Sequence, residues 1–169
     1  MGFDLQPVLN GDLLSLRPLR ASDFASLYAV ASDPAIWEQH PASNRYQPEV
    51  FRAFFRDALE SGGALIATDQ KDGRVIGSSR FRGYDEAKSE VEIGWTFLDR
   101  SCWGGAYNGE MKRLMLQHAF RFVSSVIFRV GIHNLRSQRG MEKIGGVRVG
   151  TTIDDTGNES YVYRITRVP

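Results

Sequence analysis

The sequence predicts an α+β fold, with helices and strands mixed along one domain that spans residues 1–169. Segments with the alternating pattern of strands and segments with helical spacing follow one another in the order β-α-α-β-β-β-α-β-α-β-β. The chain has 169 residues, 42% of them hydrophobic, which is enough for one substantial core. It contains no internal repeat and no low-complexity linker, so nothing indicates a second domain.

Capping residues and helix breakers set the boundaries in the first part of the chain. Ser22 or Asp23 can cap a first helix, which Pro34 prevents from continuing. Pro48 suits the first turn of a second helix, and Gly62-Gly63 ends it. The elements expected here are a strand over 13–19, a helix over 22–31, a loop over 36–47 and a helix over 48–61.

The second part alternates strands with two helices. A Lys71-Asp72-Gly73 turn joins two strands into a hairpin, and a turn over 154–158 joins the two closing strands. The spacing of Met111, Leu114 and Met115 is helical. The elements expected here are strands over 64–68, 74–81 and 88–98, a helix over 106–123, a strand over 126–132, a helix over 136–144 and the closing pair.

The strand near 88–98 leads into the most informative segment. Val91, Ile93, Trp95 and Phe97 alternate with polar or small residues, so we expect these four side chains on one face and Glu92 on the other. A strand that is followed directly by a loop and a helix is typical of a site that binds phosphate at the start of the helix.

Small residues in the following loop predict an anion site. Gly104, Gly105 and Ala106 let successive backbone N–H groups turn toward one point, where the positive end of the helix dipole adds to them. The glycine fingerprint of dinucleotide sites and the Gly-Lys-Ser/Thr of a Walker loop are both absent. We therefore expect a phosphate-bearing ligand of another kind.

Composition argues against several classes of protein. The net charge is +1 without a dense Lys/Arg run, so nucleic acid is not an expected partner. No apolar run approaches the roughly 20 residues of a membrane span, and the N-terminus resembles no signal peptide, so a soluble cytoplasmic protein is expected. Cys102 is the single cysteine, and His40, His118 and His133 lack metal-ligand spacing, so no metal is expected.

The loop resembles the pyrophosphate loop of the GNAT superfamily, the acyl-CoA-dependent N-acetyltransferases, whose motif reads Gln/Arg-x-x-Gly-x-Gly/Ala. Here it reads Ser101-x-x-Gly104-x-Ala106, with Ser101 in place of the usual Gln or Arg. The stretch 133–146 is similar to the family's Asn-x-x-Ser/Ala and Glu-Lys-hydrophobic-Gly signature. The opening 16–19 resembles the branch that includes the ribosomal-protein N-terminal acetyltransferases.

This resemblance covers nearly the whole chain and implies the GNAT fold. That fold is a mixed, mostly antiparallel sheet of about seven strands, splayed between the fourth and fifth and flanked by about four helices. The implied enzyme transfers the acetyl group of acetyl-CoA directly to a primary amine of a small molecule or a protein N-terminus. Its partners are acetyl-CoA and the amine acceptor, and we allow for a homodimer.

The resemblance also assigns roles to residues. Glu92 is implied as the base that deprotonates the amine, with Glu90 as the second choice, and Ser137 as the hydroxyl that hydrogen-bonds the CoA thiolate. Many relatives carry a tyrosine where this chain has Met141, and methionine cannot donate a proton. The cofactor-binding residues implied are Trp95, Thr96, Phe97, Gly104, Gly105, Ala106, Tyr107, Asn134 and Ser137. The charged residues that can meet the 3′-phosphate, or be simply solvated, are Arg100, Lys112, Arg113 and Arg139.

The segment 36–46 is expected to overhang the cleft, with Trp37 and Tyr46 as acceptor-binding residues. Each assignment has a structural alternative: core packing for these two rings, an ion pair for Glu92, and helix capping for Asn134 and Ser137. Two other functions remain open at this point. One is a catalytically inactive GNAT-fold module that binds CoA, and the other is a phosphate-binding protein that does not use CoA.

Overall fold

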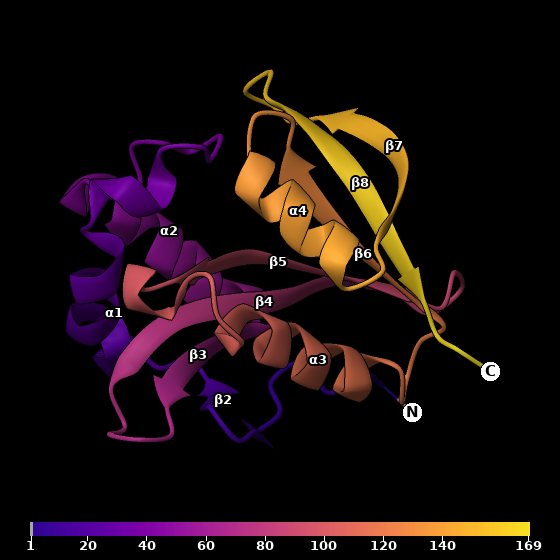
Figure 1. The fold of residues 1–169 in the computed structure, drawn as a ribbon, viewed down its shortest axis with the longest axis horizontal. Coiled ribbons are helices and arrows are strands. Elements are labelled where there is room, and N and C mark those ends of the chain that lie inside the picture. Colours follow the sequence, from indigo (N-terminus) through magenta and orange to yellow (C-terminus); the bar gives the residue numbers. More distant parts are fainter. Residues whose placement is uncertain (1) are drawn as a thin grey trace.

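The computed structural model describes residues 2–169, which form an eight-stranded sheet with helices on both faces (Figure 1). The strands lie in the order β1-β2-β3-β4-β5-β6-β8-β7. They are β1 (Leu9–Asn10), β2 (Leu14–Pro18), β3 (Ala64–Asp69), β4 (Val75–Asp85), β5 (Glu90–Leu98), β6 (Ser125–Gly131), β7 (Val147–Ile153) and β8 (Glu159–Thr166). The α-helices are α1 (Phe24–Ala31), α2 (Pro48–Ser61), α3 (Tyr107–Ala119) and α4 (Leu135–Lys143).

The predicted α+β class and the order of the main elements are confirmed. The structure adds the two-residue strand β1 and short 3₁₀ turns, one of which, Pro34–Trp37, replaces the start of the expected loop. Helix α3 ends at Ala119 instead of residue 123. Phe122 and Val123 still pack into the core from the following turn, and this is why their spacing looked helical.

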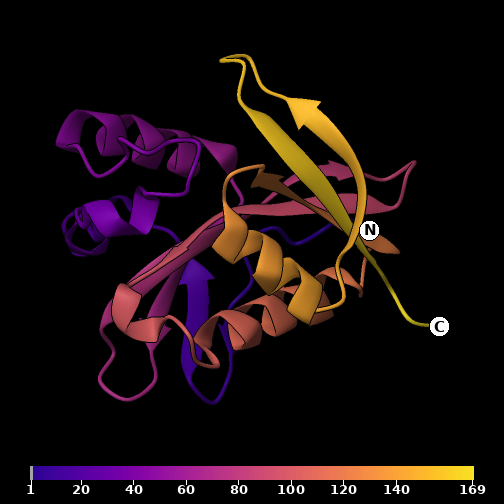
Figure 2. The same cartoon turned by 45° about the horizontal axis from the view of Figure 1, so that its top comes forward.

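The predicted splay lies between β5 and β6, the one parallel pair in the sheet formed by residues 2–169. These strands pair at three positions only, Glu90 with Ser125, Val91 with Val126, and Glu92 with Ile127. Beyond these positions they diverge, and the β6–β8–β7 part of the sheet turns away from the rest (Figure 2). The sheet therefore has two parts, β1–β5 and β6–β8–β7, which are called its two wings below.

The expectation that Val91, Ile93, Trp95 and Phe97 share one face is wrong. Val91 and Ile93 lie in the core that contains α3, whereas Phe97 lies in the core that contains α1 and α2. Between the pairs Arg80–Gly94 and Ser78–Phe97 the register shifts, and Trp95 has a φ of 54°. A β-bulge therefore inserts one residue into β5 and reverses the alternation after Gly94.

Two hydrophobic cores lie on opposite faces of the sheet. Along β3, Leu65 belongs to the core under α3 and α4, whereas the next residue, Ile66, belongs to the core under α1 and α2. This alternation is the period-2 geometry of a strand buried on both faces. Met111 and Met141 bring the helices α3 and α4 onto the first core, and Phe51 brings α2 onto the second.

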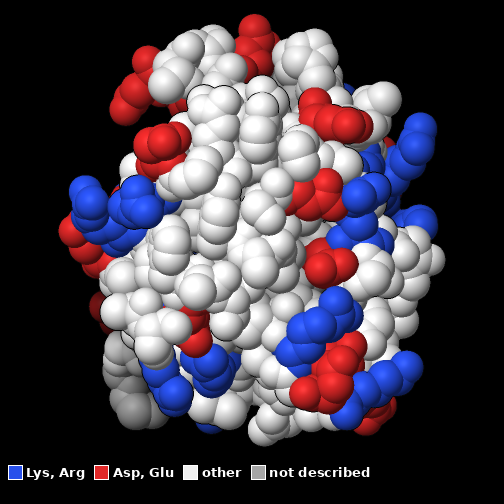
Figure 3. All heavy atoms as spheres, turned by 90° about the vertical axis from the view of Figure 1, so that its left-hand side faces the viewer, with Lys and Arg blue, Asp and Glu red and all other residues white. Residues whose placement is uncertain are grey.

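Charged residues are mixed on the surface. The face in Figure 3, which is the left-hand side of Figure 1, carries Lys or Arg beside Asp or Glu around an uncharged band. No helix within residues 2–169 combines the length and the apolar character needed to cross a membrane.

Glu110 in the first turn of α3 fastens this helix to the N-terminal strands. Its Oε1 accepts a hydrogen bond from the backbone N–H of Asp12 at 2.9 Å, and its Oε2 accepts from those of Leu13 and Leu14 at 2.8 and 2.9 Å. A Cβ at Gly11 would lie 2.6 Å from this carboxyl group, so a larger residue there would displace the carboxyl group from its partners. The sequence patterns assign Glu110 no structural role, because its partners are about 100 residues away in the chain.

We expect Glu110→Gln to lower the free energy of unfolding by about 1.5–3 kcal/mol, the usual range for hydrogen bonds to a charged group. The amide would present an NH₂ group to backbone donors that now meet a carboxylate. Urea unfolding followed by circular dichroism measures the change. Glu60→Gln on the exposed side of α2 is the matched control, expected within about 0.5 kcal/mol of the wild type. Equal effects of the two variants would contradict the anchoring role.

Candidate active site

A cleft of about 1060 Å³ lies where β5 and β6 diverge. Its walls come from the segment 36–45, from β5 and β6, from the loop before α3, and from α4 and the β7–β8 turn. Polar side chains and backbone from distant parts of the chain meet there. A cavity of this size is typical of ligand sites in proteins.

The loop before α3 presents an uncapped helix N-terminus to this cleft. Ala106 is the N-cap residue and makes no side-chain capping hydrogen bond. Gly104, with a φ of 72°, and Gly105 line the cleft, and a Cβ at either would meet nothing within 4 Å. The first turn of α3, which begins at Tyr107, therefore has backbone N–H groups that no side chain caps.

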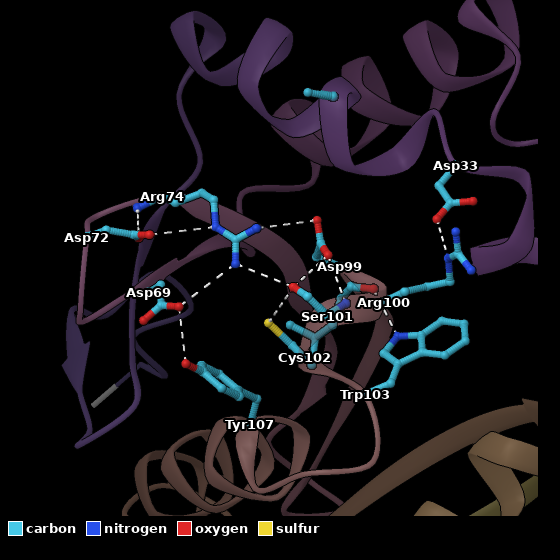
Figure 4. Close-up of polar contacts among 12 residues, drawn as sticks. Asp33, Asp69, Asp72, Arg74, Asp99, Arg100, Ser101, Cys102, Trp103 and Tyr107 are labelled. Atoms are coloured by element: carbon cyan, nitrogen blue, oxygen red, sulfur yellow. Dashed lines mark hydrogen bonds and ion pairs between the residues drawn. The ribbon is translucent and has the colours of Figure 1, made fainter.

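A polar network behind the loop holds it in place (Figure 4). The Asp99 carboxylate accepts hydrogen bonds from the Ser101 N–H and hydroxyl at 2.9 and 2.8 Å. The Arg74 guanidinium lies 3.7 Å from Asp99 and 4.0 Å from Asp69, and the Tyr107 hydroxyl donates to Asp69 at 3.1 Å. The network ties the loop to the β3–β4 hairpin, and it turns the Tyr107 ring away from the cleft. Ala106 and Tyr107 do not line the cleft.

Glu92 lies on the cleft wall at the end of the β5–β6 pairing, and it is only 8% exposed. Burial raises the pKa of its carboxyl group, and the nearby Arg129, Arg82 and Arg80 oppose this rise. Arg129 of β6 lies closest, with its Nε 3.8 Å from Oε2 of Glu92. A carboxylate in this state can accept a proton closer to neutral pH than a solvated one.

Trp95, Thr96 and Phe97 all line the cleft, but their side chains contact different parts of the protein. The Phe97 ring packs 5.1 Å from that of Trp37, and the Trp95 ring lies 4.7 Å from the guanidinium of Arg80. The Thr96 hydroxyl points the other way, toward Lys112, whose Nζ donates to it at 2.8 Å. Alternation along the strand separates Thr96 from its two neighbours, and the β-bulge decides which face of the sheet each of them is on.

Lys112 is not a solvated helix residue, which was one of the two roles considered from the sequence. Its side chain is 7% exposed, and it lines the cleft from the side of α3. Burial alone lowers the pKa of its ammonium group from 10.5 to about 7. Helical periodicity could have placed Lys112 on the same side of α3 as Leu116. Only tertiary packing decides how deeply that side of the helix is buried.

Helix α4 contributes Asn134, Ser137 and Met141 to the cleft. Asn134 is the N-cap residue, and its Oδ1 accepts from the Ser137 N–H at 3.4 Å, so capping is one of its roles. The Ser137 hydroxyl has no hydrogen-bond partner in the part of the chain that the structure describes, residues 2–169. Met141 is buried and supplies no proton donor.

The two aromatic residues expected at the acceptor end differ in position. Trp37 borders the cleft but is 1% exposed, with its Nε1 donating to the Ala31 carbonyl at 2.8 Å. Tyr46 does not line the cleft, whereas its neighbour Arg45 does. The Arg45 guanidinium lies 4.3 Å from the Phe54 ring. Burial, assisted by a nearby arginine, lowers the pKa of Arg45 to about 10. The sequence reasoning missed Arg45.

Within residues 2–169, no group of three or more His, Cys, Asp or Glu side chains is arranged to hold a metal ion. Cys102 is buried, and burial raises the pKa of its thiol, so little of it is the nucleophilic thiolate. Glu92, Lys112 and Ser137 remain as reactive candidates in the cleft, because burial lowers the pKa of His40, which also lines it, to about 3.

Comparison with solved structures identifies the same architecture in other proteins. A protein of T. thermophilus assigned as an acetyltransferase is 26% identical, with a TM-score of 0.76 over 94% of this chain and 88% of the other. The acetyltransferase from Agrobacterium tumefaciens str. C58 is 23% identical, with a TM-score of 0.75 over 95% of each chain. The ribosomal-protein-S5-alanine acetyltransferase of Vibrio fischeri shares the fold at 12% identity, with a TM-score of 0.71 over 95% of this chain and 96% of that one.

A search of curated proteins gave no match. The sequence itself matches the family described as acetyltransferase (GNAT) domain over residues 14–147, which is most of the chain. This range contains the bulged strand, the glycine loop and helix α4. The splayed sheet, the uncapped helix and this match agree, and the chain belongs to the GNAT acetyltransferase family.

Proposed function

We propose that this protein transfers the acetyl group of acetyl-CoA to a primary amine of a small molecule or a protein N-terminus. One observation carries the proposal. The uncapped N-terminus of α3 and the buried carboxylate of Glu92 open onto the same cleft. An anion site for the carrier and a proton acceptor for the amine are two parts that acetyl transfer requires.

The residues of the loop fit the pyrophosphate of CoA. The open space at Gly104 and Gly105 leaves room for phosphate oxygens. None of the cleft-lining residues from Gly104 to Asn108 carries a carboxylate that would repel them. Backbone N–H groups of the loop residues that line the cleft would hold the pyrophosphate. The edge of β5 from Trp95 to Phe97 lacks a strand partner on the β6 side and would pair with the pantetheine, beside Asn134.

In the proposed reaction Glu92 accepts the proton that the attacking amine loses, directly or through a water molecule. The Ser137 hydroxyl donates a hydrogen bond to the sulfur as the carbon–sulfur bond breaks. The buried thiol of Cys102 and its raised pKa favour direct transfer between two bound substrates over an acyl-enzyme. The identity of the acceptor, a cytoplasmic location and a homodimer remain predictions.

A module that binds CoA without catalysis is the second candidate, and one observation favours it. Met141 is buried in the position where many relatives carry a tyrosine, so the usual proton donor to sulfur is missing. One experiment distinguishes the enzyme from the module. Release of free CoA from acetyl-CoA over a panel of amino acids, peptides, polyamines and aminoglycosides supports the enzyme, and tight binding without release supports the module.

We expect Gly105→Asp to weaken acetyl-CoA binding about 100-fold, which corresponds to about 2.8 kcal/mol. The substitution puts bulk and a negative charge where the pyrophosphate would lie, and Gly105 has no positive φ that would add strain. Isothermal titration calorimetry measures the affinity. Gly150→Asp on the exposed strand β7 is the matched control, because a side chain there also meets nothing within 4 Å. Unchanged affinity in folded Gly105→Asp would remove the loop from the site.

We expect Glu92→Gln to lower kcat by roughly 10²–10⁴, the usual contribution of a general base, with little change in acetyl-CoA affinity. A base works only when deprotonated, so wild-type activity should rise with pH through the raised pKa of Glu92. The variant should lack this limb of the pH profile. Glu90→Gln is the control, since Glu90 is held by the Ser125 hydroxyl at 2.8 Å. A normal rate in Glu92→Gln would contradict the assignment.

The acceptor wall is proposed to include Trp37 and Arg45, whose guanidinium adds hydrogen-bond donors, whereas Tyr46 lies outside the cleft lining. We expect Arg45→Met to raise the acceptor KM by about 10- to 100-fold, because a charged hydrogen bond contributes roughly 1.5–3 kcal/mol. The acetyl-CoA Kd should not change. Arg52→Met, on the outside of α2, serves as the control. If Arg45→Met changes both substrates equally, the acceptor lies elsewhere.

A further inference from the structure

Lys112 enters the gap between the diverging strands from the side of α3. Its Nζ donates a 2.8 Å hydrogen bond to the Thr96 hydroxyl on β5, and it lies 5.4 Å from the centre of the Phe128 ring on β6. The Thr96 hydroxyl is in turn 2.8 Å from that of Ser79 on β4. Lys112 thus contacts both diverging strands at residues that lie beyond their last pair, Glu92 with Ile127.

Lys112 has no ion pair within residues 2–169. The neighbouring groups from β4, β5 and β6 are two hydroxyls and an aromatic ring, so burial is the one cause of its lowered pKa. A buried cation without a carboxylate partner destabilises a fold. Its presence beside a ligand cleft therefore indicates a role in binding or catalysis. The charged residues on the walls of the same cleft are Arg45, Glu92, Arg129, Arg136, Arg139, Lys143 and Asp154.

Glu92 and Lys112 approach the cleft from opposite faces of the sheet. Before the bulge, Ile93 faces the core of α3, so Glu92 faces the side of α1 and α2. After the bulge the alternation is reversed, so Thr96 and its partner Lys112 lie on the side of α3. A proton acceptor and a proton donor therefore flank the cleft, the donor on the side of the phosphate loop.

Acetyl transfer needs both groups. The nitrogen loses a proton as it forms the new bond, and the sulfur that leaves as a thiolate gains one. Met141 cannot donate, and the Ser137 hydroxyl can hydrogen-bond a thiolate but is too weak an acid to protonate it. We propose that Lys112 is the catalytic acid that protonates the CoA thiolate, an inference that rests on the acetyl transfer proposed above.

The proposed step balances in protons and electrons. As the carbon–nitrogen bond forms, Glu92 takes a proton from the nitrogen. As the carbon–sulfur bond breaks with its electron pair on sulfur, Lys112 gives a proton to the sulfur and becomes a neutral amine. Solvent then returns a proton to Lys112 and removes one from Glu92. A lysine of ordinary pKa, about 10.4, is a weaker acid than a thiol such as that of cysteine, at about 8.5, so it would not favour giving its proton to a thiolate. The lowered pKa of Lys112, about 7, makes the transfer favourable.

The first test measures binding instead of activity. Calorimetry compares CoA with desulfo-CoA, in which the sulfur is missing, for the wild type and for Lys112→Met. If Lys112 touches the sulfur, the wild type should prefer CoA by about tenfold, and Lys112→Met should lose this preference while keeping its affinity for desulfo-CoA. Lys88→Met in the exposed β4–β5 turn is the matched control. An unchanged preference in Lys112→Met overturns the proposal.

The second test measures the pH profile of turnover with an acceptor from the amine panel. The acid must be protonated, so the wild-type rate should fall as pH rises through the pKa of Lys112. Lys112→Met should lose this limb and lower kcat by roughly 10²–10⁴. Lys112→Arg keeps the charge but cannot release a proton near neutral pH, so it should keep the preference for CoA and still be slow. A normal rate in either variant contradicts the acid role.

The outcomes separate this inference from the function on which it rests. If the wild type neither binds CoA nor acetylates any amine, both fail. If the wild type is active and Lys112→Met is unchanged in rate, pH profile and CoA preference, only the role of Lys112 fails. An acetyl group found on Lys112 by mass spectrometry would also overturn the role, since the amine would then be an acceptor. Lys112→Met should fold, because methionine removes a buried charge, and Lys112→Gln provides a second variant for the same measurements.

Discussion

The short parallel pairing between β5 and β6 is the constraint on which the rest of the structure depends. Three paired positions hold the two wings of the sheet together, and divergence beyond them leaves an edge of β5 without a strand partner. Backbone groups at such an edge need partners, and a ligand can supply them. The cleft lies at this divergence, and side chains from α3, α4 and the segment before α2 line it together.

The bulge at Trp95 lets strand β5 contribute side chains to both hydrophobic cores. Because it reverses the alternation, β5 places Ile93 in the core of α3 and Phe97 in the core of α1 and α2. It also sets the Trp95 ring against Arg80, which is 1% exposed and has two side-chain nitrogens without hydrogen-bond partners in the described chain. Stacking on the ring and an ion pair with Asp57 at 2.8 Å compensate for them.

Burial acts in opposite directions on the two ionisable groups that matter most. It raises the pKa of the Glu92 carboxyl and lowers that of the Lys112 ammonium, because in each case it disfavours the charged form. Three arginines moderate the effect at Glu92, whereas no charge moderates it at Lys112. Two groups with convergent pKa values on either side of a cleft are what an acid–base reaction near neutral pH requires.

The splay between the fourth and fifth strands was implied only by the resemblance to the GNAT family. The sequence patterns alone determined the α+β class, the order of the main elements and the loop at Gly104 and Gly105. These features depend on local patterns, namely alternation, helical spacing and small residues at a strand-to-helix junction. The sequence also brought Glu92 into consideration, because its position on the strand is local information.

Tertiary structure decided the features that depend on contacts between distant segments. One inserted residue in β5 moved Phe97 to the other face, and no periodicity shows where a strand pairs irregularly with its neighbour. Glu110 meets backbone donors near residue 12, and Lys112 is buried against Thr96 of β5 and Phe128 of β6. Burial and pKa are properties of the packed environment, so a lysine that looks solvated in the sequence can lie inside a cleft in the fold.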